Sequence, residues 1–189
     1  MRFDRDVYFS HVREELFEGA LDQMQVDGQN LLLGLFESGY TGTPMDDVRW
    51  LAYILATTYH ETAHTFWPVT EYGSQDYLES KEYYPYIGRG FVQITWKSNY
   101  EHASKQLSLT GIRDLVAHPE MALDSLIASR CVFRGMSEGW YTGKKLGQYF
   151  NATTDDPVNA RQIVNGNDCD TLIAGYHATF LAALEAATA

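Results

Sequence analysis

The chain has 189 residues, of which 45% are hydrophobic, so it is long enough to bury a core and is not a disordered polymer. Its 14 basic and 25 acidic residues give a net charge of −11, and the basic residues form no cluster. Because binding to phosphates needs a basic face, we expect no nucleic-acid partner. We find no repeat or linker, and therefore expect residues 1–189 to form a single domain without a separate binding module.

The sequence also bears on the compartment in which the protein is made. The first residues, MRFDRDVYFSHVREELF, contain acidic side chains and no apolar run, and no stretch of 18 apolar residues occurs in the chain. We therefore expect synthesis in the cytoplasm without a signal peptide, and no stable insertion into a membrane. Cys131 and Cys169 lack the spacing of a metal knuckle, and we expect two buried free thiols.

The first 64 residues are predicted to be mainly helical. We expect packing helices at residues 10–18 and 22–37, because apolar side chains recur along the second of these segments with helical spacing. A third helix is predicted to begin at Thr43-Pro44-Met45-Asp46, with threonine as the N-cap and proline at the first helical position, and to run to about His64.

This third helix carries a carboxylate on its buried side. Leu51, Ile54, Leu55 and Thr58 recur at intervals of three and four residues, and Glu61 continues the same stripe at the C-terminal end. Burial raises the pKa of a glutamate and favours its protonated form, which a general acid needs at neutral pH. We therefore expect Glu61 to be a general acid.

An irregular, aromatic region follows Trp67-Pro68, which ends the helical run. The tyrosines of residues 69–86, Tyr72 among them, indicate either a satellite of the core or a cleft wall that stacks on sugar rings. Gly88-Arg89-Gly90 then leads into a predicted strand at residues 91–95, with Gln93 and Thr95 on the face towards the cleft.

The remaining residues are predicted to be helices joined by short loops. Thr95 is expected to cap a helix at residues 96–107, which places Asn99 near the same cleft. Further helices are expected at residues 119–134, from 155 to Asn165-Gly166, and at 170–187.

One constellation is the zinc signature H-E-x-x-H, which His60-Glu61-Thr62-Ala63-His64 matches. The extended form of that motif fails, because it needs glycine at Trp67 and histidine at Thr70. Glu79 or Glu82 remains open as a third ligand, and ordinary packing at a helix end is the alternative for both histidines. A zinc metallopeptidase is therefore an alternative function from a different class.

A second constellation is a pair of carboxylates. Glu61 ends the predicted helix, and Glu71 follows ten residues later, beyond the turn at Trp67-Pro68. Cleavage of a glycosidic bond needs one carboxyl group to protonate the leaving oxygen and another to stabilise charge or activate water. The pair therefore predicts a glycosidase that needs no metal and no organic cofactor.

Three blocks of the chain resemble glycoside hydrolase family 19, the chitinase-like family, in the short form found in bacteriophage and prophage endolysins. They are YHETAHTFWPVTEYG, YYPYIGRGFVQITWKSNY and NARQIVNG, in that order and spacing. The resemblance covers about residues 50–166. It implies a mainly α, lysozyme-like domain with a small β element beside the active-site cleft.

The resemblance also implies roles for individual residues. Glu61 corresponds to the general acid and Glu71 to the second, catalytic carboxylate, in a reaction that inverts the anomeric carbon. The matching substrate-binding positions are Gln93, Thr95, Asn99 and Asn165, and we add Tyr72 and Arg89 as neighbours of these motifs. Arg89 between two glycines also fits a structural ion pair, and Asn165-Gly166 also fits a helix C-cap.

These observations together predict an endolysin that hydrolyses the β-1,4 bonds of peptidoglycan. Chitin, or a chitin-like oligosaccharide, is the alternative substrate, since it shares the N-acetylglucosamine unit. We expect a monomer that acts on the cell wall after release through a separate pore-forming protein.

Overall fold

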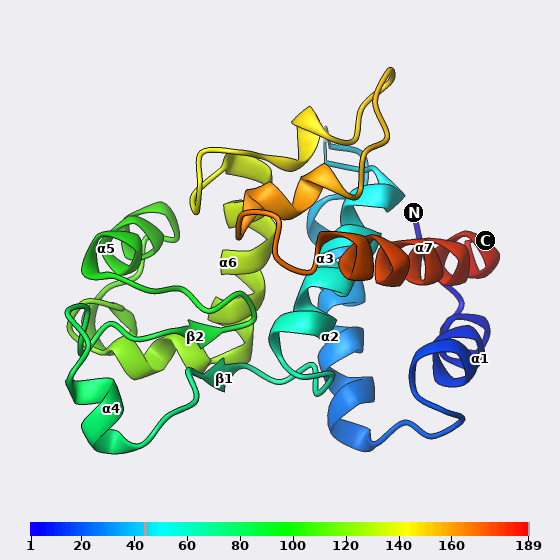
Figure 1. The fold of residues 1–189 in the computed structure, drawn as a ribbon. Helices are drawn as coiled ribbons and strands as arrows, with labels where there is room; N and C mark the ends of the chain where they lie inside the picture. The colour runs from blue at the N-terminus through cyan, green and yellow to red at the C-terminus, as the bar shows by residue number, and fades with distance from the viewer. Residues whose placement is uncertain (44, 189) are drawn as a thin grey trace.

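A computed structural model describes residues 1–43 and 45–188, and its elements are mainly helical (Figure 1). The helices are α1 (Arg5–Leu16), α2 (Gln23–Gly39), α3 (Val48–Glu61), α4 (Gln75–Glu79), α5 (Lys97–Gln106), α6 (Ser125–Glu138) and α7 (Asp170–Ala187). Two short strands, β1 (Val69–Thr70) and β2 (Arg89–Gly90), pair antiparallel. In the described part of the chain, none of the helices has the length and apolar character needed to cross a membrane.

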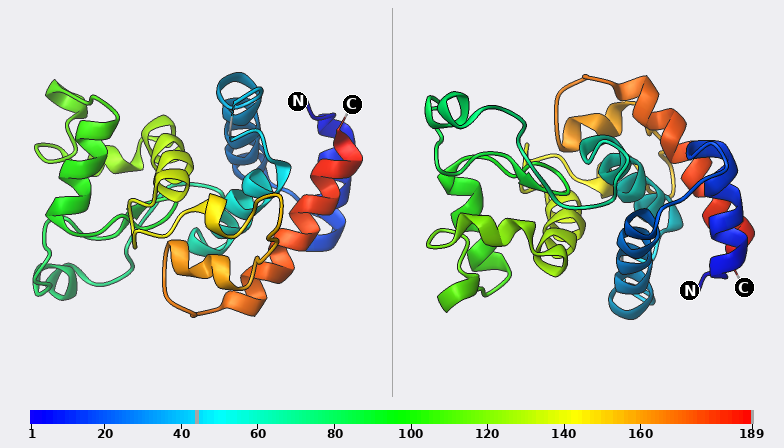
Figure 2. Two further views of the ribbon diagram at one scale, coloured as in Figure 1. Left: turned by 90° about the horizontal axis from the view of Figure 1, so that it is seen from above. Right: turned by 90° about the horizontal axis from the view of Figure 1, so that it is seen from below.

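The helices form two groups on either side of α6. Figure 1 shows α1, α2, α3 and α7 on one side of α6, and α4, α5 and the two strands on the other. The chain ends meet where α1 lies beside α7, since the amide of Asp4 donates to the carbonyl oxygen of Ala187 at 2.8 Å (Figure 2). The single sheet register pairs Val69 with Gly90 and Thr70 with Arg89.

The predicted stripe of α3 is buried as expected, but the helix begins later and ends earlier than predicted. Asp47 is the N-cap, and its carboxylate accepts a hydrogen bond from the amide of Arg49 at 2.9 Å. Thr43 instead forms a turn in which its hydroxyl accepts from the amide of Met45, so the start expected at Thr43 is wrong. The role predicted for Pro44 lies outside the described residues. The helix ends at Glu61 rather than His64.

The strand predicted at residues 91–95 is a turn instead. β2 consists of Arg89 and Gly90 alone, and Ile94 folds back to bridge Arg89, with its amide donating to the Arg89 carbonyl at 2.9 Å. Gln93 has a φ of 53° inside this turn, which an extended strand does not allow. The alternation of faces still holds, because Val92 and Ile94 are buried while Gln93 is partly exposed.

Two of the later helices have other bounds than predicted, and α6 extends to Glu138, beyond the predicted end at residue 134. Asp124 interrupts the segment 119–134, because it has extended geometry and caps α6 by accepting from the amides of Leu126 and Ile127. Residues 155–166 contain only a 3-10 turn, Asn159–Ile163 (η4). The last helix, α7, has the predicted bounds.

The two cysteines have different surroundings. Both are free thiols, as predicted, and Cys131 is buried on α6. Cys169 is exposed, so the prediction of burial is wrong there, because it occupies the N-cap of α7 with a φ of 56°.

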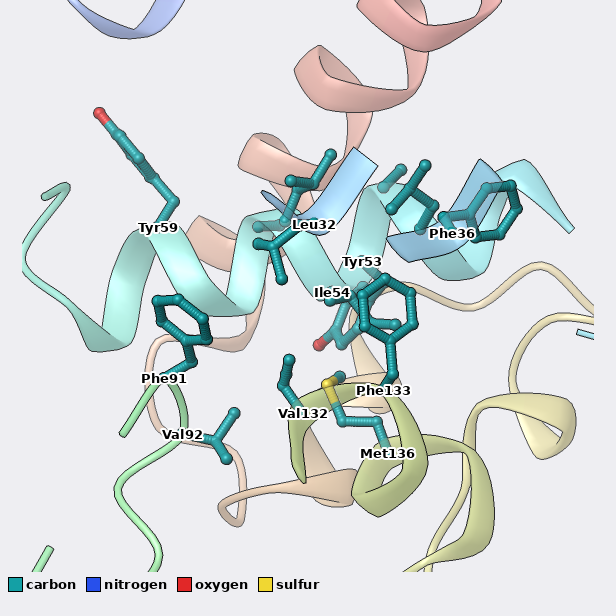
Figure 3. Packing of buried hydrophobic residues seen from close by; sticks show 14 of the residues in the cluster. Leu32, Phe36, Tyr53, Ile54, Tyr59, Phe91, Val92, Val132, Phe133 and Met136 are labelled. Carbon is teal, nitrogen blue, oxygen red and sulfur yellow. The ribbon is translucent and has the colours of Figure 1, made fainter. Parts of the chain in front are cut away.

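The core lies where α3 meets α2, α6 and α7. Figure 3 shows Tyr53 and Ile54 of α3 packed near Phe133 and Met136 of α6. These four side chains are at most 1% exposed. Burial of such large apolar side chains stabilises the fold by about 1.5–3 kcal/mol each, so α3 is held rigidly up to its C-terminal turn.

A buried histidine makes the stability of this core depend on pH. His177 on α7 is 3% exposed, lies between Tyr53 and Phe150, and has its pKa lowered to about 4, chiefly by burial. Below about pH 6.5 the unfolded chain binds a proton that the folded chain does not, so stability must fall with decreasing pH until about pH 4. We expect a loss of roughly 3 kcal/mol across this window.

Urea denaturation between pH 4 and pH 7 measures this dependence for the wild type and for His177→Phe. The variant should lose this part of the slope, whereas the same measurement on His11→Gln, a change at an exposed position, should keep it. Equal slopes in the wild type and His177→Phe would contradict the assignment.

Candidate active site

The C-terminal turn of α3 presents Glu61 in a buried ion pair. Arg161 of η4 donates from Nη1 to Oε1 of Glu61 at 2.6 Å, and the two side chains are 2% and 16% exposed. Nε of Arg161 donates to the carbonyl oxygen of Asp168 at 2.8 Å, which fixes the guanidinium. Figure 1 shows the orange segment around residue 160 beside α3. Glu61 is thus carried inward as expected, but its charge is compensated by a guanidinium that the sequence did not indicate.

The loop after Glu61 has an unusual backbone that is held from two sides. Ala63, His64 and Phe66 all have positive φ values, of 49°, 69° and 53°. Buried Thr62 ties the loop together, since its hydroxyl donates to the Thr58 carbonyl and accepts from the Phe66 amide. Strained backbone of this kind persists only where its surroundings determine it.

Helix α2 supports this loop through Gly28. A Cβ atom at Gly28 would collide with the backbone oxygen of Phe66 and would lie 2.8 Å from the Phe66 Cβ. We expect Gly28→Ala to destabilise the fold by about 1–3 kcal/mol, since a backbone group must shift to make room. Chemical denaturation measures the change.

Gly34, on the same helix, provides the matched control. A Cβ there meets nothing within 4 Å, so Gly34→Ala should stabilise by about 0.4–1 kcal/mol. If Gly28→Ala were as harmless as Gly34→Ala, the close approach of α2 to the loop would be refuted.

Glu71 is anchored by both of its carboxylate oxygens. The Tyr83 hydroxyl donates to Oε1 at 2.8 Å, and the Gly88 amide donates to Oε2 at 3.0 Å. Burial and this hydrogen bond to Glu71 raise the pKa of Tyr83 to about 12, so the phenol keeps its proton at neutral pH. Gly88 lies close to both side chains, since a Cβ there would lie 2.8 Å from Oε1 of Gln93 and 3.3 Å from the Glu71 Cβ, so a larger residue would displace the Gln93 amide.

The other predicted side chains bind the surrounding backbone. Nε2 of Gln93 donates to the Val69 carbonyl of β1 at 2.9 Å and to the Gly90 carbonyl of β2 at 3.3 Å, so the amide bridges the two strands. The Thr95 hydroxyl donates to the Gln93 carbonyl, and Asn99 donates to the Thr95 carbonyl at 2.8 Å. The cap predicted for Thr95 is wrong, because Trp96 occupies the N-cap of α5 without a side-chain bond.

Arg89 and Asn165 lie in different surroundings. The Arg89 guanidinium donates to the Pro85 carbonyl and to the Tyr100 hydroxyl, both at 3.0 Å. It therefore holds the turn by hydrogen bonds rather than by the ion pair suggested as its structural role. Asn165 is exposed, and its side-chain oxygen accepts from the Gly166 amide at 3.1 Å.

A cavity of about 330 Å³ brings part of the predicted site together. Its lining residues are Glu61, Thr62, Ala63, Val69, Thr70, Tyr72 and Gln93. Glu61 and its loop thus form one wall, and the β1 segment with Gln93 forms another. Tyr72 is 99% exposed at this site, so its ring is free to contact a ligand. Glu71 is not itself among the lining residues, but it lies between two of them in the chain, Thr70 of β1 and Tyr72.

The zinc motif does not have the geometry that its chemistry requires. Two ligand histidines must lie one turn apart on a helix, but α3 ends at Glu61, and His64 has a left-handed backbone. The His64 ring stacks on Tyr59 with centroids 3.9 Å apart. In the described residues, no three His, Cys, Asp or Glu side chains come together as a metal site. The geometry therefore does not favour the zinc-peptidase alternative.

Arg161 is the residue of the site that sequence reasoning missed. It lies inside the block NARQIVNG, four residues before Asn165, which was singled out instead. Its single positive charge within a short, otherwise uncharged block was the available indication, since a buried arginine needs an acidic partner.

A helix-borne glutamate beside a small antiparallel sheet, within a mainly helical chain, is a lysozyme-like architecture. Comparison with solved structures shows the fold of the family 19 chitinases. Chitinase C from Streptomyces griseus has a TM-score of 0.60 at 19% identity, over 97% of this chain and 76% of that one. A bacterial family 19 chitinase has a TM-score of 0.58 at 20% identity, over 96% and 94% of the two chains. The predicted fold class is confirmed.

Comparison with curated sequences finds chitinases as well. An acidic endochitinase of Dioscorea japonica is 28% identical over 138 residues, which are 68% of this chain and 51% of that protein. An endochitinase of Arabidopsis thaliana is 31% identical over 144 residues, which are 70% of this chain and 44% of that protein. The chain thus spans about half the length of these relatives. No protein-family model matches it.

Proposed function

We propose that the protein is a glycoside hydrolase that cleaves β-1,4 bonds between N-acetylated amino sugars. The observation that carries this proposal is Glu61, held at the end of a rigid helix by Arg161 and opening into a 330 Å³ cavity. The likeness to chitinases in fold and sequence supports the same class of reaction.

In this proposal the Glu61 carboxyl group takes up a proton before each turnover and gives it to the leaving oxygen, and Glu71 activates the water that attacks the anomeric carbon. Glu71 suits the second role because Tyr83 and the Gly88 amide fix both of its oxygens. Water between two carboxyl groups requires a separation of about 6.5–9.5 Å, and the reaction then inverts the anomeric carbon. Nuclear magnetic resonance of the first product tests this: an inverted anomer is expected, and a retained one would contradict the role of Glu71.

The walls of the cavity suit an N-acetylated sugar. An amide such as Gln93 pairs with the polar edge of an N-acetyl group, and the exposed Tyr72 ring offers a flat surface to a sugar face. Thr95, Asn99 and Asn165 are proposed to complete the contacts with sugars or with water at the edges of this site.

The proposed substrate is peptidoglycan, in the manner of an endolysin, with chitin as the second candidate. The resemblance of the three sequence blocks to endolysins favours peptidoglycan, whereas the names of the similar proteins favour chitin. Reducing-end release from purified peptidoglycan and from chitin hexamer, at matched sugar concentration, decides between them. A larger kcat/KM on peptidoglycan is expected, and a larger value on chitin hexamer would assign the protein to chitin.

The cellular part of the proposal is that the enzyme reaches the wall through a separate pore-forming protein and acts as a monomer. Expression in bacteria with and without such a pore former tests the first point. Lysis from within should need the pore former, and the protein outside intact cells without it would contradict this route.

A further inference from the structure

Helix α3 carries three buried hydroxyl groups that have no hydrogen-bond partner among the described residues. They belong to Tyr53, Thr57 and Thr58, all within the two helical turns before Glu61, and each side chain is at most 1% exposed. Buried hydroxyl groups are almost always hydrogen-bonded, to protein or to internal water, so this concentration calls for a physical cause.

The spacing along α3 separates these hydroxyl groups into two sets. Tyr53, Thr57 and Glu61 follow one another at intervals of four residues, so they lie on one face of the helix. Thr58 is seven residues after Leu51 and four after Ile54, and belongs to the apolar stripe in the core. Thr58 also lies three residues before Glu61, so the carboxylate borders both sets, with Tyr53 and Thr57 on one flank and Thr58 with the apolar stripe on the other.

The environment of Tyr53 connects it to the ion pair. Figure 3 shows its side chain projecting from α3 into the interior, and its ring lies 5.3 Å from Phe150 and 5.7 Å from His177, centroid to centroid. Burial raises the pKa of the Tyr53 phenol, and the nearby charge of Arg161 partly opposes this effect. The phenol thus keeps its proton in the field of the guanidinium that binds Glu61.

We propose that Tyr53 and Thr57 are positioning residues for Glu61, and that their hydroxyl groups hold one internal water on the inner side of the Glu61–Arg161 pair. An internal water needs two to four polar partners; the two hydroxyl groups supply two, and the ion pair supplies another. The water keeps the carboxyl group turned towards the cavity. The catalytic part of this inference rests on the proposed function, whereas the water site does not.

A kinetic comparison of four variants tests the positioning role. Tyr53→Phe and Thr57→Val each remove one hydroxyl group with little change of volume, and should lower kcat about tenfold or more at unchanged KM. Thr57→Ser keeps the hydroxyl group and should retain activity. Thr58→Val is the matched control, because it removes the third hydroxyl group, which lies in the apolar stripe and not on the flank of Tyr53 and Thr57, and should leave kcat unchanged. Melting temperatures show whether each variant is folded.

A crystal structure of the wild type provides a measurement that needs no activity and no variant. Ordered density for a water within hydrogen-bond distance of both hydroxyl groups is expected, and its absence would overturn the inference. Unchanged kcat in folded Tyr53→Phe and Thr57→Val, or an equal loss in Thr58→Val, would overturn it as well. An inactive wild type that shows the water would refute the proposed function and leave the water site standing.

Discussion

Replacement of Glu61 by glutamine is expected to lower kcat for glycan hydrolysis by about 10²- to 10⁴-fold, with KM little changed. The amide keeps the shape of the side chain and an oxygen that accepts from Arg161, but it has no proton to give to the leaving oxygen. Binding of sugars to the cavity walls should therefore survive while bond cleavage is lost. Reducing-end assays at several substrate concentrations separate kcat from KM.

Glu82→Gln is the matched control for this variant. Glu82 is an exposed glutamate of the region between β1 and β2, and the same chemical change there should leave activity as it is. Since Glu61→Gln leaves the buried Arg161 without its counter-ion, assays belong well below the melting temperature of the variant. Full activity of folded Glu61→Gln would remove Glu61 from the mechanism.

Replacement of Arg161 by methionine is expected to destabilise the fold by about 3–5 kcal/mol and to abolish activity. The change leaves the Glu61 carboxylate, which is only 16% exposed, without a cation, and breaks the bond to the Asp168 carbonyl that holds η4 in place. Methionine has a similar length and is apolar, so the loss reports the charge rather than a cavity. Urea denaturation at pH 7 measures the free energy of unfolding.

Two further variants make this prediction specific. In the Arg161→Met background, the added change Glu61→Gln should restore part of the lost stability, because it removes the unpaired charge. Lys97→Met breaks an exposed pair with Glu101, whose side chains are 59% and 54% exposed, and should cost less than about 1 kcal/mol. If Arg161→Met cost no more than Lys97→Met, the buried pair would not contribute as described.

Helical periodicity predicted the parts of the fold whose residues form their own pattern. The stripe Leu51, Ile54, Leu55 and Thr58 is buried, since its pattern repeats over several turns, and α7, predicted from its alanine-rich composition, has the predicted bounds. Segments that depend on a few backbone angles were not predicted. Gln93 and Trp96 have positive φ values, which no composition rule assigns to these residue types, and they turn an expected strand and cap into a loop.

The candidate site was predicted only in part for a related reason. Motif matches placed Glu61 and Gln93, the aromatic pattern added Tyr72, and these three side chains line one cavity. The partner of Glu61 lies 100 residues further along the chain, and no local pattern brings η4 beside α3. Long-range contacts of this kind depend on the packing of the whole core. They therefore cannot be predicted from local patterns in the sequence.

The most direct test of the proposed chemistry identifies the bond that the purified protein breaks. Purified peptidoglycan is incubated with the wild type, with and without EDTA, and both new reducing ends and new free amines are counted. Reducing ends should appear equally with and without EDTA, and no new amines should appear, because two carboxyl groups carry out the reaction. New amines without reducing ends, or lysis that EDTA stops, would contradict the two-carboxylate mechanism. Either result would instead indicate that the HETAH segment binds zinc in a metallopeptidase.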